Sequence, residues 1–526
     1  MTVSHSPPRS ATPRSATPRS AIQRTAGAAR PADPAPSPPP DRLAELDRIL
    51  ARDPAATDAL RARAALHREQ DAFASAKRDY LELIRREPTD FAALNDFGTL
   101  VLKAGYREAA RSLFTAAVRH HPDNANGRVN LGNLLLLLGE LDDARAHFEA
   151  ALTLDPGHVH AHRGLGNLLA ERGDEAGARR HRDLGFKGRA VTVLPYRGAA
   201  PPIALLLLVA AAGGNIPTEA LIDDRRFAVT VLVADYADAN APLPPHDVVF
   251  NAIGDADLCG EALAAACALV ARSPRPVVNH PARVAATGRL ANAERLRGLP
   301  GVVVPRLVMV PRKAFAAPAL AAAAVAASGL EFPLLVRAPG FHTGRHFLRA
   351  ETAAELAAAA AQIPADAVWL IAPLEARDAL GNFRKYRAMF VGGALYPLHL
   401  ALSRHWKVHY FTADMAESAA HRAQDAAFLA DQSSIGGKAV AALHRIRDAL
   451  GLDYGGVDFA VDAGGDVLFF EANATMAVYP PLTDPKWDYR RGAVEAVIAA
   501  VQTMLVERAQ QGPSAAGREA ANAVSG

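Results

Sequence analysis

The sequence has very little cysteine and lysine, and it has no long apolar run. Its 526 residues include only two cysteines, Cys259 and Cys267. Their spacing provides neither a disulfide framework nor a metal motif, and it favours a reducing compartment. The longest apolar run, at 203–212, has about half the length that a membrane span requires. We therefore expect a cytoplasmic protein that does not cross a membrane.

The chain is also poor in net charge. It contains 50 arginines and 8 lysines, yet its net charge is only +3. A nearly balanced charge gives no reason to expect a nucleic-acid partner. The excess of arginine and alanine indicates a general compositional bias, so a single arginine carries little information. The length exceeds what one hydrophobic core fills, and we expect roughly two to four domains.

The segment 1–40 lacks apolar periodicity and has no acidic residue before Asp33. It is rich in Pro, Ser and Arg and repeats the unit RSATP, so it cannot bury a core, and we expect a disordered tail. An Arg- and Ser-rich start also resembles an organelle transit peptide, although the repeated prolines disfavour the amphipathic helix of such a signal. At the other end, we expect a flexible tail at 506–526.

A period of 34 residues organises the segment 41–186. The small Gly132 and Ala144 would let two antiparallel helices approach, an aromatic would fill the space toward the next pair, and Pro would end the second helix. Three residue classes that share one period predict a helical solenoid. The recurring positions are Pro54, Pro88, Pro122 and Pro156; Ala76, Ala110, Ala144 and Ala178; and Tyr80, Phe114 and Phe148.

This pattern resembles the tetratricopeptide repeat (TPR) family, with about four repeats. The last repeat has Arg182 where an aromatic belongs, and we expect it to act as a polar cap. The resemblance implies a groove for a peptide or a partner protein. Asn133 and Asn167 occupy equivalent positions on successive first helices and are candidates for hydrogen bonds to a peptide backbone. They suit a solvated helix face equally well.

The pattern changes to an α/β type after a proline-marked linker, and we expect a Rossmann-like domain at 195–310. A helix at 260–272 between apolar strand-like runs predicts a parallel sheet. Gly213 and Gly214 favour a tight turn over a nucleotide loop, because no complete GxGxxG motif follows. The apolar runs that we interpret as strands are residues 203–212, 227–236, 247–255 and 276–281.

Residues 311–505 predict a further, α+β domain. Two strands flank a glycine-containing loop at 332–348, another strand covers 368–376, and a hairpin at 383–402 turns at Gly392-Gly393. Helices are expected at 416–431 and 433–451, before a last hairpin at 455–476.

That last hairpin, GGVDFAVDAGGDVLFFEANATM, places polar residues inside apolar strands. Glu471 and Asn473 are two residues apart and therefore face the same way. Asp458 lies on the strand that pairs with theirs through the DAGGD turn. Buried ions are tolerated when they are paired or bind a metal. Hard oxygen donors without cysteine suit Mg²⁺, which needs only one or two carboxylates beside substrate phosphates.

The same hairpin resembles the metal-binding hairpin of the ATP-grasp superfamily, which includes carboxylate–amine ligases of the glutathione synthetase type. The motif is an acidic residue followed, about a dozen residues later, by Glu-x-Asn, and here the separation is 13. The resemblance extends over residues 200–505, with the Rossmann-like domain as the pre-ATP-grasp unit. It implies that Asp458, Glu471 and Asn473 hold Mg²⁺ against the phosphates of ATP.

The resemblance also implies roles for residues outside the hairpin. Arg289 and Arg337 stand where the family has phosphate-binding lysines. Three explanations stay open for these exchanges: bidentate phosphate binding by arginine, the compositional bias, or a nucleotide binder that has lost turnover. Arg387 matches the arginine that contacts the transferred phosphoryl group. The remaining nucleotide-binding candidates are Gly340 and Gly344 in a mobile loop, Leu374 and Glu375 in the adenine-contacting hinge, and Lys385 and Lys407.

Three histidines close to this region, His399, His405 and His409, are candidates for a substrate pocket. For each histidine taken alone, ordinary strand packing is the favoured explanation, and their spacing does not suit zinc.

The two resemblances together imply an ATP- and Mg²⁺-dependent ligase that joins a carboxylate to an amine through an acyl phosphate, with TPR repeats that recruit a peptide or protein. Two alternatives stay open: a non-catalytic TPR scaffold with a nucleotide-sensing ATP-grasp domain, and a kinase that stops at the phosphorylated acceptor. The two substrates are not identified by the sequence, because a fold does not define its substrate pockets.

Overall fold

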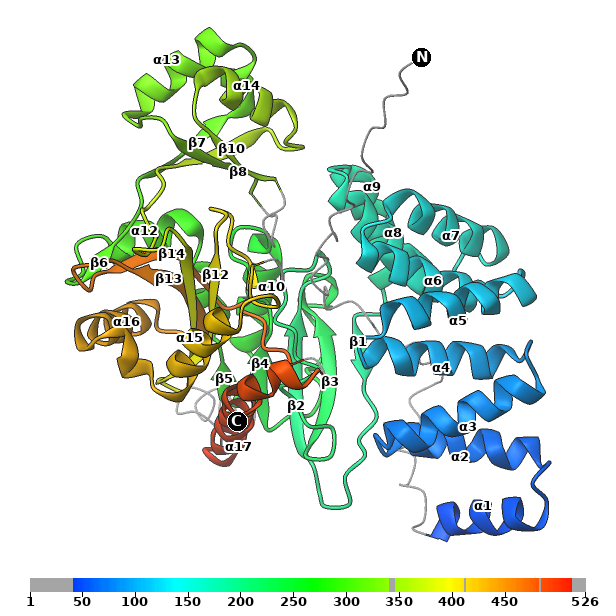
Figure 1. Ribbon diagram of the computed structural model, residues 1–526. Coiled ribbons are helices and arrows are strands. Elements are labelled where there is room, and N and C mark those ends of the chain that lie inside the picture. The colour runs from blue at the N-terminus through cyan, green and yellow to red at the C-terminus, as the bar shows by residue number, and fades with distance from the viewer. Residues whose placement is uncertain (1–40, 340–345, 411–412, 482–483, 513–526) are drawn as a thin grey trace, which may run out of the picture.

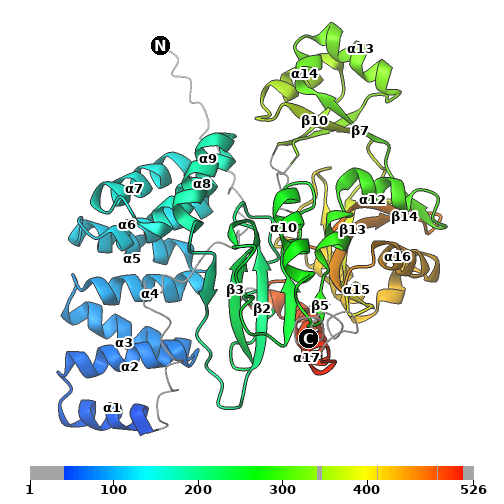
Figure 2. The same ribbon diagram turned by 180° about the vertical axis from the view of Figure 1, so that it is seen from behind.

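The computed structural model describes residues 41–339, 346–410, 413–481 and 484–512. The predicted N-terminal tail and the glycines Gly340 and Gly344 lie outside these residues. A stack of helices stands beside a mixed α/β body, and both views show the two parts side by side (Figures 1 and 2). No helix among the described residues combines the length and the apolar character that crossing a membrane requires.

The stack, residues 41–186, confirms the predicted helical solenoid. Four consecutive helix pairs, α2/α3, α4/α5, α6/α7 and α8/α9, follow the single helix α1. The helices are α1 (Asp41–Arg52), α2 (Thr57–Glu69), α3 (Phe73–Arg86), α4 (Phe91–Lys103), α5 (Arg107–His120), α6 (Ala125–Leu138), α7 (Leu141–Leu154), α8 (Val159–Glu171) and α9 (Glu175–Phe186).

Glycine and aromatic residues interlock in the core of the solenoid. A Cβ atom on Gly132 would lie 2.9 Å from the ring of the buried Phe148, and one on Gly164 would lie 2.4 Å from it. Gly98 stands in the same relation to Phe114, at 2.6 Å. The 34-residue period is therefore a steric one, because each aromatic ring occupies the space that a missing side chain leaves on the adjoining helices.

The expectation that Arg182 caps the solenoid is wrong. Its side chain is only 9 % exposed, it packs over Gly166, and Nη2 donates a hydrogen bond to Glu175 at 2.9 Å. The physical reason is local: the aliphatic stem of Arg182 packs against Gly166 of α8, where earlier repeats place an aromatic ring against a glycine.

Several contacts hold the solenoid against the α/β body. Strand β1 (Val191–Val193) follows α9 directly and pairs antiparallel with β3, while Phe186 packs against Tyr236 with ring centroids 5.5 Å apart. Farther down the stack, Asp71 accepts hydrogen bonds from Arg197 at 3.0 Å and from Arg225 at 3.3 Å.

The first sheet has the strand order β1-β3-β2-β4-β5, and its last four strands are parallel, as the sequence predicts. Gly213 and Gly214 have positive φ angles in a turn after β2. The elements are β2 (Ile203–Val209), β3 (Phe227–Val233), β4 (Val248–Asn251), β5 (Val277–Val278), α10 (Gly260–Val270), α11 (Pro281–Ala285) and α12 (Arg289–Leu296).

A second, antiparallel sheet with the order β7-β10-β8-β9 forms, with α13 and α14, a unit with its own core. We call residues 307–371 the small lobe. It stands apart from the rest of the α/β body in both ribbon views. Its elements are β7 (Leu307–Pro311), α13 (Pro318–Ser328), β8 (Leu334–Arg337), β9 (Phe347–Ala350), α14 (Ala353–Ala361) and β10 (Ala367–Ile371).

The third sheet, called the large sheet, has the order β12-β11-β13-β14-β6. It shares one continuous core with the first sheet, so the two form a rigid base below the small lobe. The hairpin turn at Gly392-Gly393 is where the sequence predicts it. The elements are β6 (Val302–Val303), β11 (Phe383–Val391), β12 (Ala394–Ser403), α15 (Ala419–Ala430), α16 (Gly437–Leu450), β13 (Tyr454–Val461), β14 (Val467–Asn473) and α17 (Arg491–Gln510).

Helix α17 corrects the predicted C-terminal tail. The helix continues through Gln510, because Val501, Met504 and Leu505 are buried against the common core. The expected flexible segment therefore does not begin at 506. Short 3₁₀ turns complete the described fold at Ala234–Tyr236, Arg312–Phe315, Gln432–Ile435 and Pro485–Arg490.

Candidate functional site

A row of charged side chains crosses the large sheet. Arg387 on β11 lies opposite Asp458 on β13, and Asp458 lies opposite Glu471 on β14. Directly opposed residues place their Cβ atoms about 4.5–5.5 Å apart. The predicted pairing that brings Asp458 beside Glu471 is therefore confirmed. Asn473 follows on the same face and donates a hydrogen bond from Nδ2 to Glu471 Oε1 at 2.9 Å.

Asp458 is buried and paired with two cations. Arg387 donates to its two carboxylate oxygens at 2.6 and 2.8 Å, and Lys385 Nζ donates at 3.1 Å. Burial alone would raise the pKa of Asp458, but the charges of Arg387 and Lys385 outweigh burial and hold this pKa well below its ordinary range. Asp458 is therefore ionised at neutral pH.

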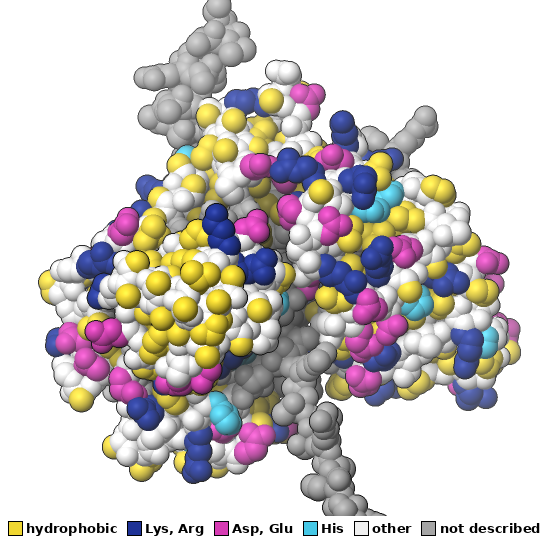
Figure 3. All heavy atoms as spheres, turned by 90° about the horizontal axis from the view of Figure 1, so that it is seen from above, with side chains coloured by type: hydrophobic (Ala, Val, Ile, Leu, Met, Phe, Trp, Pro, Cys, Tyr) yellow, Lys and Arg dark blue, Asp and Glu magenta, His cyan; other side chains and the backbone are white. Residues whose placement is uncertain are grey.

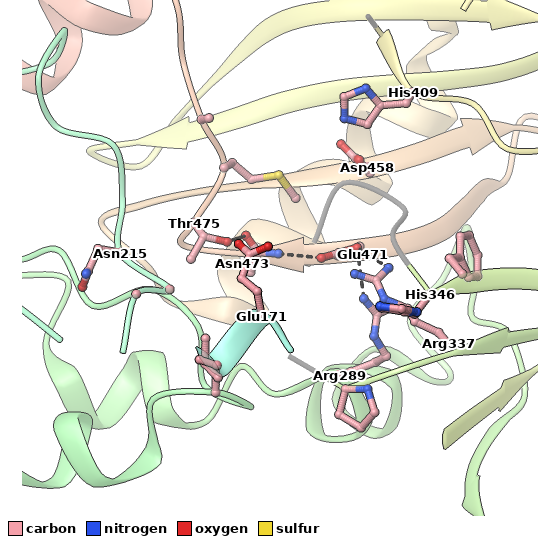
Figure 4. Close-up of a pocket in the computed structure, with 18 of the residues that line it drawn as sticks. Glu171, Asn215, Arg289, Arg337, His346, His409, Asp458, Glu471, Asn473 and Thr475 are labelled. Atoms are coloured by element: carbon pink, nitrogen blue, oxygen red, sulfur yellow. Dashed lines mark hydrogen bonds and ion pairs between the residues drawn. The ribbon is translucent and has the colours of Figure 1, made fainter. Parts of the chain in front are cut away.

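Glu471 has its own pair of cations, which come from different elements (Figure 4). Arg289 Nη2, at the start of α12, lies 3.0 Å from Oε2, and Arg337 Nη1, at the end of β8, lies 3.2 Å from it. Burial lowers the pKa of Arg337 despite the opposing charge of Glu471. Because Arg337 belongs to the small lobe, this ion pair joins the small lobe to the large sheet.

These residues line one large cavity of about 1990 Å³. Its walls come from the large sheet, the small lobe, the first sheet and the solenoid. Figure 3 shows the hollow between the small lobe and the end of the solenoid. The predicted site residues that line the cavity are Arg289, Arg337, Glu375, Lys385, Arg387, Lys407, Asp458, Glu471 and Asn473. Gly340 and Gly344 lie outside the described residues.

The predicted hinge forms one apolar wall of this cavity. Leu374 packs with Phe470 against the buried Ala376. Glu375 instead stands at the rim, where it is 63 % exposed and bonded to Arg377 at 2.7 Å. Of the two hinge candidates, Leu374 offers an apolar surface and Glu375 a solvated carboxylate.

Lys407 forms a second bridge between the sheets. Its Nζ donates a hydrogen bond to the carbonyl oxygen of Phe347 on β9 at 3.1 Å. Burial and the charge of Arg337 lower the pKa of Lys407. The side chain adds a cation at the mouth of the cavity on the small-lobe side.

Only one of the three candidate histidines lines the cavity. His399 is buried on β12, where it lies opposite Arg387, and its ring is 4.7 Å from that of Tyr410, so packing explains it. His405 is exposed. His409 lines the cavity wall, and burial together with the charges of Lys385 and Arg387 lowers its pKa to about 4. The substrate-pocket expectation therefore survives for His409 alone.

The structure adds cavity residues that the sequence did not single out. Thr475, in the turn directly after β14, donates a hydrogen bond to Asn473 Oδ1 at 2.8 Å, and its position two residues after Asn473 was the available signal. Phe347 lies under the guanidinium of Arg337 at 5.6 Å and meets Trp406 edge to face at 5.2 Å. No sequence pattern marks these two aromatic residues, because they approach from separate sheets.

The donor set fits a divalent cation and a polyanion together. Asp458, Glu471 and Asn473 present hard oxygen donors from adjacent positions, and Mg²⁺ needs few protein ligands when phosphates complete its shell. Five cationic side chains (Arg289, Arg337, Lys385, Arg387 and Lys407) surround two carboxylates, which leaves an excess of positive charge for an anionic ligand. Within the described ranges, no group of three or more His, Cys, Asp or Glu residues is placed so that it could hold a metal ion.

Comparison with known proteins identifies the solenoid. The tetratricopeptide repeat family matches residues 95–159 and 138–181. The N-terminal helices contain tetratricopeptide repeats. No curated protein matches the chain.

Solved structures similar to the chain include MamA from Desulfovibrio magneticus RS-1, which is 20% identical over 26% of this chain and 78% of that one, with a TM-score of 0.25. YrrB, described as a TPR protein with an unusual peptide-binding site, is 24% identical over 27% of this chain and 74% of its own, with a TM-score of 0.25. PilF from Pseudomonas aeruginosa is 22% identical over 27% and 65%, with a TM-score of 0.26.

Proposed function

We propose that the α/β body is an ATP-grasp ligase that binds Mg²⁺-ATP in the cavity and joins a carboxylate to an amine. The observation that carries the proposal is the row Arg387–Asp458–Glu471, with its cations contributed by the large sheet, α12 and the small lobe. A row of this kind combines metal-binding oxygen donors with phosphate-binding cations, which is what phosphoryl transfer requires.

The residues divide into binding and charge-stabilising roles. Arg289, Arg337, Lys385 and Lys407 would hold the phosphates, and the apolar wall at Leu374 would face the adenine ring beside Glu375. In the present structure Lys385 and Arg387 bind Asp458, so phosphate oxygens would take over part of this pairing.

Asp458, Glu471 and Asn473 would hold Mg²⁺, which when bound supplies neutralisation of the charge that develops on the transferred phosphoryl group. Arg387 would stabilise the same charge from the adjoining strand. The carboxylate of the acceptor would receive the phosphoryl group, and the amine would then displace phosphate from the acyl carbon. Closure of the cavity would exclude the water that hydrolyses an acyl phosphate.

The TPR solenoid would supply a protein-interaction surface, since TPR repeats suggest a peptide- or protein-binding scaffold. The complete protein would then act on a substrate, or in a complex, that the solenoid recruits.

The test is a coupled assay of ADP release by the full chain with Mg²⁺-ATP and a matrix of carboxylates and primary amines. We expect ADP release that depends on both acceptors and that falls at least a hundredfold in Arg387→Met. Arg491→Met is the matched control, because the side chain of Arg491 is 43 % exposed and pairs only with Asp488 among the described residues. Equal activity in wild type and Arg387→Met would contradict the assigned role.

The same assay separates the alternatives. A non-catalytic scaffold would show thermal protection by Mg²⁺-ATP and no ADP with any acceptor pair. A kinase would release ADP without an amine and accumulate a stable phosphorylated product. The exchange of both expected phosphate lysines for Arg289 and Arg337 is the observation that keeps the scaffold as the second candidate.

A further inference from the structure

The solenoid and the charged row belong to one cavity. Helices α4, α6 and α8 contribute two sets of lining residues that are 34 residues apart: Thr99, Asn133 and Asn167, and Leu102, Leu136 and Ala170. We call these six residues the groove ladder. It offers a polar position and an apolar or small position on each successive repeat.

The two asparagines of the groove ladder have hydrogen-bonding capacity left. Asn133 and Asn167 are half-buried, and the side chain of neither forms a hydrogen bond with another described residue. The neighbouring Asn130, in contrast, bonds Asn95 at 2.6 Å. A primary amide both donates and accepts, as does a peptide group, so each asparagine matches one unit of an extended backbone.

The spacing of the groove ladder suits an extended peptide. Helices α6 and α8 pack directly against each other, and packed helices lie about 8–10 Å apart. An extended chain advances about 3.3 Å per residue, so one step of the groove ladder corresponds to about three peptide residues.

The groove ladder ends close to the charged row of the large sheet. Glu171, the last residue of α8, lines the same cavity as Asn473 and Thr475 (Figure 4). The turn after α8 approaches the small lobe, since a Cβ atom on Gly173 would lie 3.5 Å from the carbonyl oxygen of Pro364. A chain lying along the ladder therefore reaches the charged row without leaving the cavity.

Charge determines which end of a peptide approaches the charged row. The end of the cavity beside the charged row holds more cations than carboxylates. At the seam, where the solenoid meets the first sheet, the charged side chains instead pair with each other, as Arg179 does with Glu261 and Arg182 with Glu175. A terminal carboxylate is attracted to the end beside the charged row and a terminal ammonium is repelled from it.

We propose that a peptide bound along the groove ladder is itself the substrate, and that its terminal carboxylate is the group the enzyme activates. The proposal rests on the ligase function proposed above. A carboxylate oxygen attacks the γ-phosphorus, the new P–O bond forms as the bond to the β,γ-bridging oxygen breaks, and ADP leaves. The nitrogen of a small primary amine then attacks the acyl carbon, phosphate departs, and the amine proton passes to water.

The experiment uses the full chain, Mg²⁺-ATP and hydroxylamine as the amine. Its carboxylate probes are a degenerate octapeptide pool with free carboxyl ends, the same pool with amidated ends, and N-acetylglycine. ADP release and hydroxamate are both measured. We expect the free pool to exceed N-acetylglycine in kcat/KM by at least tenfold, and the amidated pool to give only the background rate.

A double variant, Asn133→Leu with Asn167→Leu, tests the groove ladder. It should raise the KM for the peptide pool at least tenfold relative to that for N-acetylglycine. Asn126→Leu is the control, because Asn126 is exposed on α6 away from the cavity. Activity with N-acetylglycine but no preference for the free pool, or no KM shift in the double variant, would overturn the inference while the ligase function stands. No ADP release with any probe would overturn both.

Discussion

The solenoid and the charged row of the large sheet are built by opposite rules. In the solenoid, each side chain meets partners one helix away, as Phe148 meets Gly132 and Gly164, and the identity of a residue is set by the volume it fills. At the row, Arg289 and Arg337 reach Glu471 from distant parts of the chain, and the identity of a residue is set by charge. The 34-residue period therefore predicts how the solenoid packs, whereas the chemistry of the large sheet depends on residues that do not repeat.

The largest expected effect comes from breaking the row. Asp458→Ala leaves Lys385 and Arg387 as two unpaired cations in a buried position, and removing one partner of such an ion pair costs about 3–5 kcal/mol. Urea unfolding followed by circular dichroism measures the loss. Asp488→Ala is the control, because its exposed pairing with Arg491 contributes at most about 0.5 kcal/mol. Equal losses in the two variants would mean that the row is not a charge-paired unit.

A volume change in the solenoid should have the next effect. Phe148 is fully buried, so Phe148→Ala leaves a cavity against Gly132 and Gly164 and costs about 3 kcal/mol. The same unfolding experiment applies, with Leu154→Ala as the control, since Leu154 is 41% exposed. A loss no greater than the control's would contradict the steric origin of the period.

Mild acid should lower the free energy of unfolding of the solenoid more than that of the charged row. We expect this effect to be smaller than that of Phe148→Ala. Burial, together with the charges of Arg163 and His158, lowers the pKa of His160 in the solenoid to about 4. Between an ordinary histidine pKa of about 6.5 and this value, the unfolded chain binds a proton that the folded chain does not, so the free energy of unfolding falls as pH falls. For Asp458 the lowered pKa delays the corresponding loss to pH values below the ordinary aspartate range.

The variant His160→Gln checks this sign. Its free energy of unfolding should fall by about 1–2 kcal/mol less than that of wild type between pH 7 and pH 5. Urea unfolding at the two pH values provides the measurement. If the substitution does not change how the free energy of unfolding depends on pH, His160 is excluded as a source of the loss in acid.

The smallest effect is expected at the seam between the two regions. Arg179 and Glu261 are 3.4 Å apart but 63% and 84% exposed, so Arg179→Ala should change the free energy of unfolding by less than about 0.5 kcal/mol. Arg197→Ala is the matched comparison, because Arg197 is 21% exposed and bonds both Asp224 and Asp71. A larger loss in Arg179→Ala than in Arg197→Ala would reverse this view of the seam.

The sequence predicted the solenoid because its period repeats several times, and it predicted the hairpin that brings Asp458 beside Glu471 because turn residues separate two apolar runs. It did not predict Phe347 and Trp406, which meet only after two sheets are placed. It failed at Arg182 because the aliphatic stem of an arginine can pack against Gly166 in place of an aromatic ring, which leaves the side chain only 9 % exposed.

The continuity between the groove ladder and the charged row was also beyond sequence reasoning. Strand β1 turns the solenoid against the first sheet, and the contact of Asp71 with Arg197 holds it there. Neither contact has a sequence signature, because each depends on two separately folded parts.

The most direct test of the account is calorimetric titration of the full chain with ATP, in Mg²⁺ and in EDTA. We predict saturable binding in Mg²⁺ that weakens at least tenfold in EDTA and at least tenfold in Glu471→Gln, with Glu417→Gln, an exposed position, unchanged. Absence of ATP binding, or equal affinity in wild type and Glu471→Gln, would contradict the assignment of the charged row as a magnesium–nucleotide site.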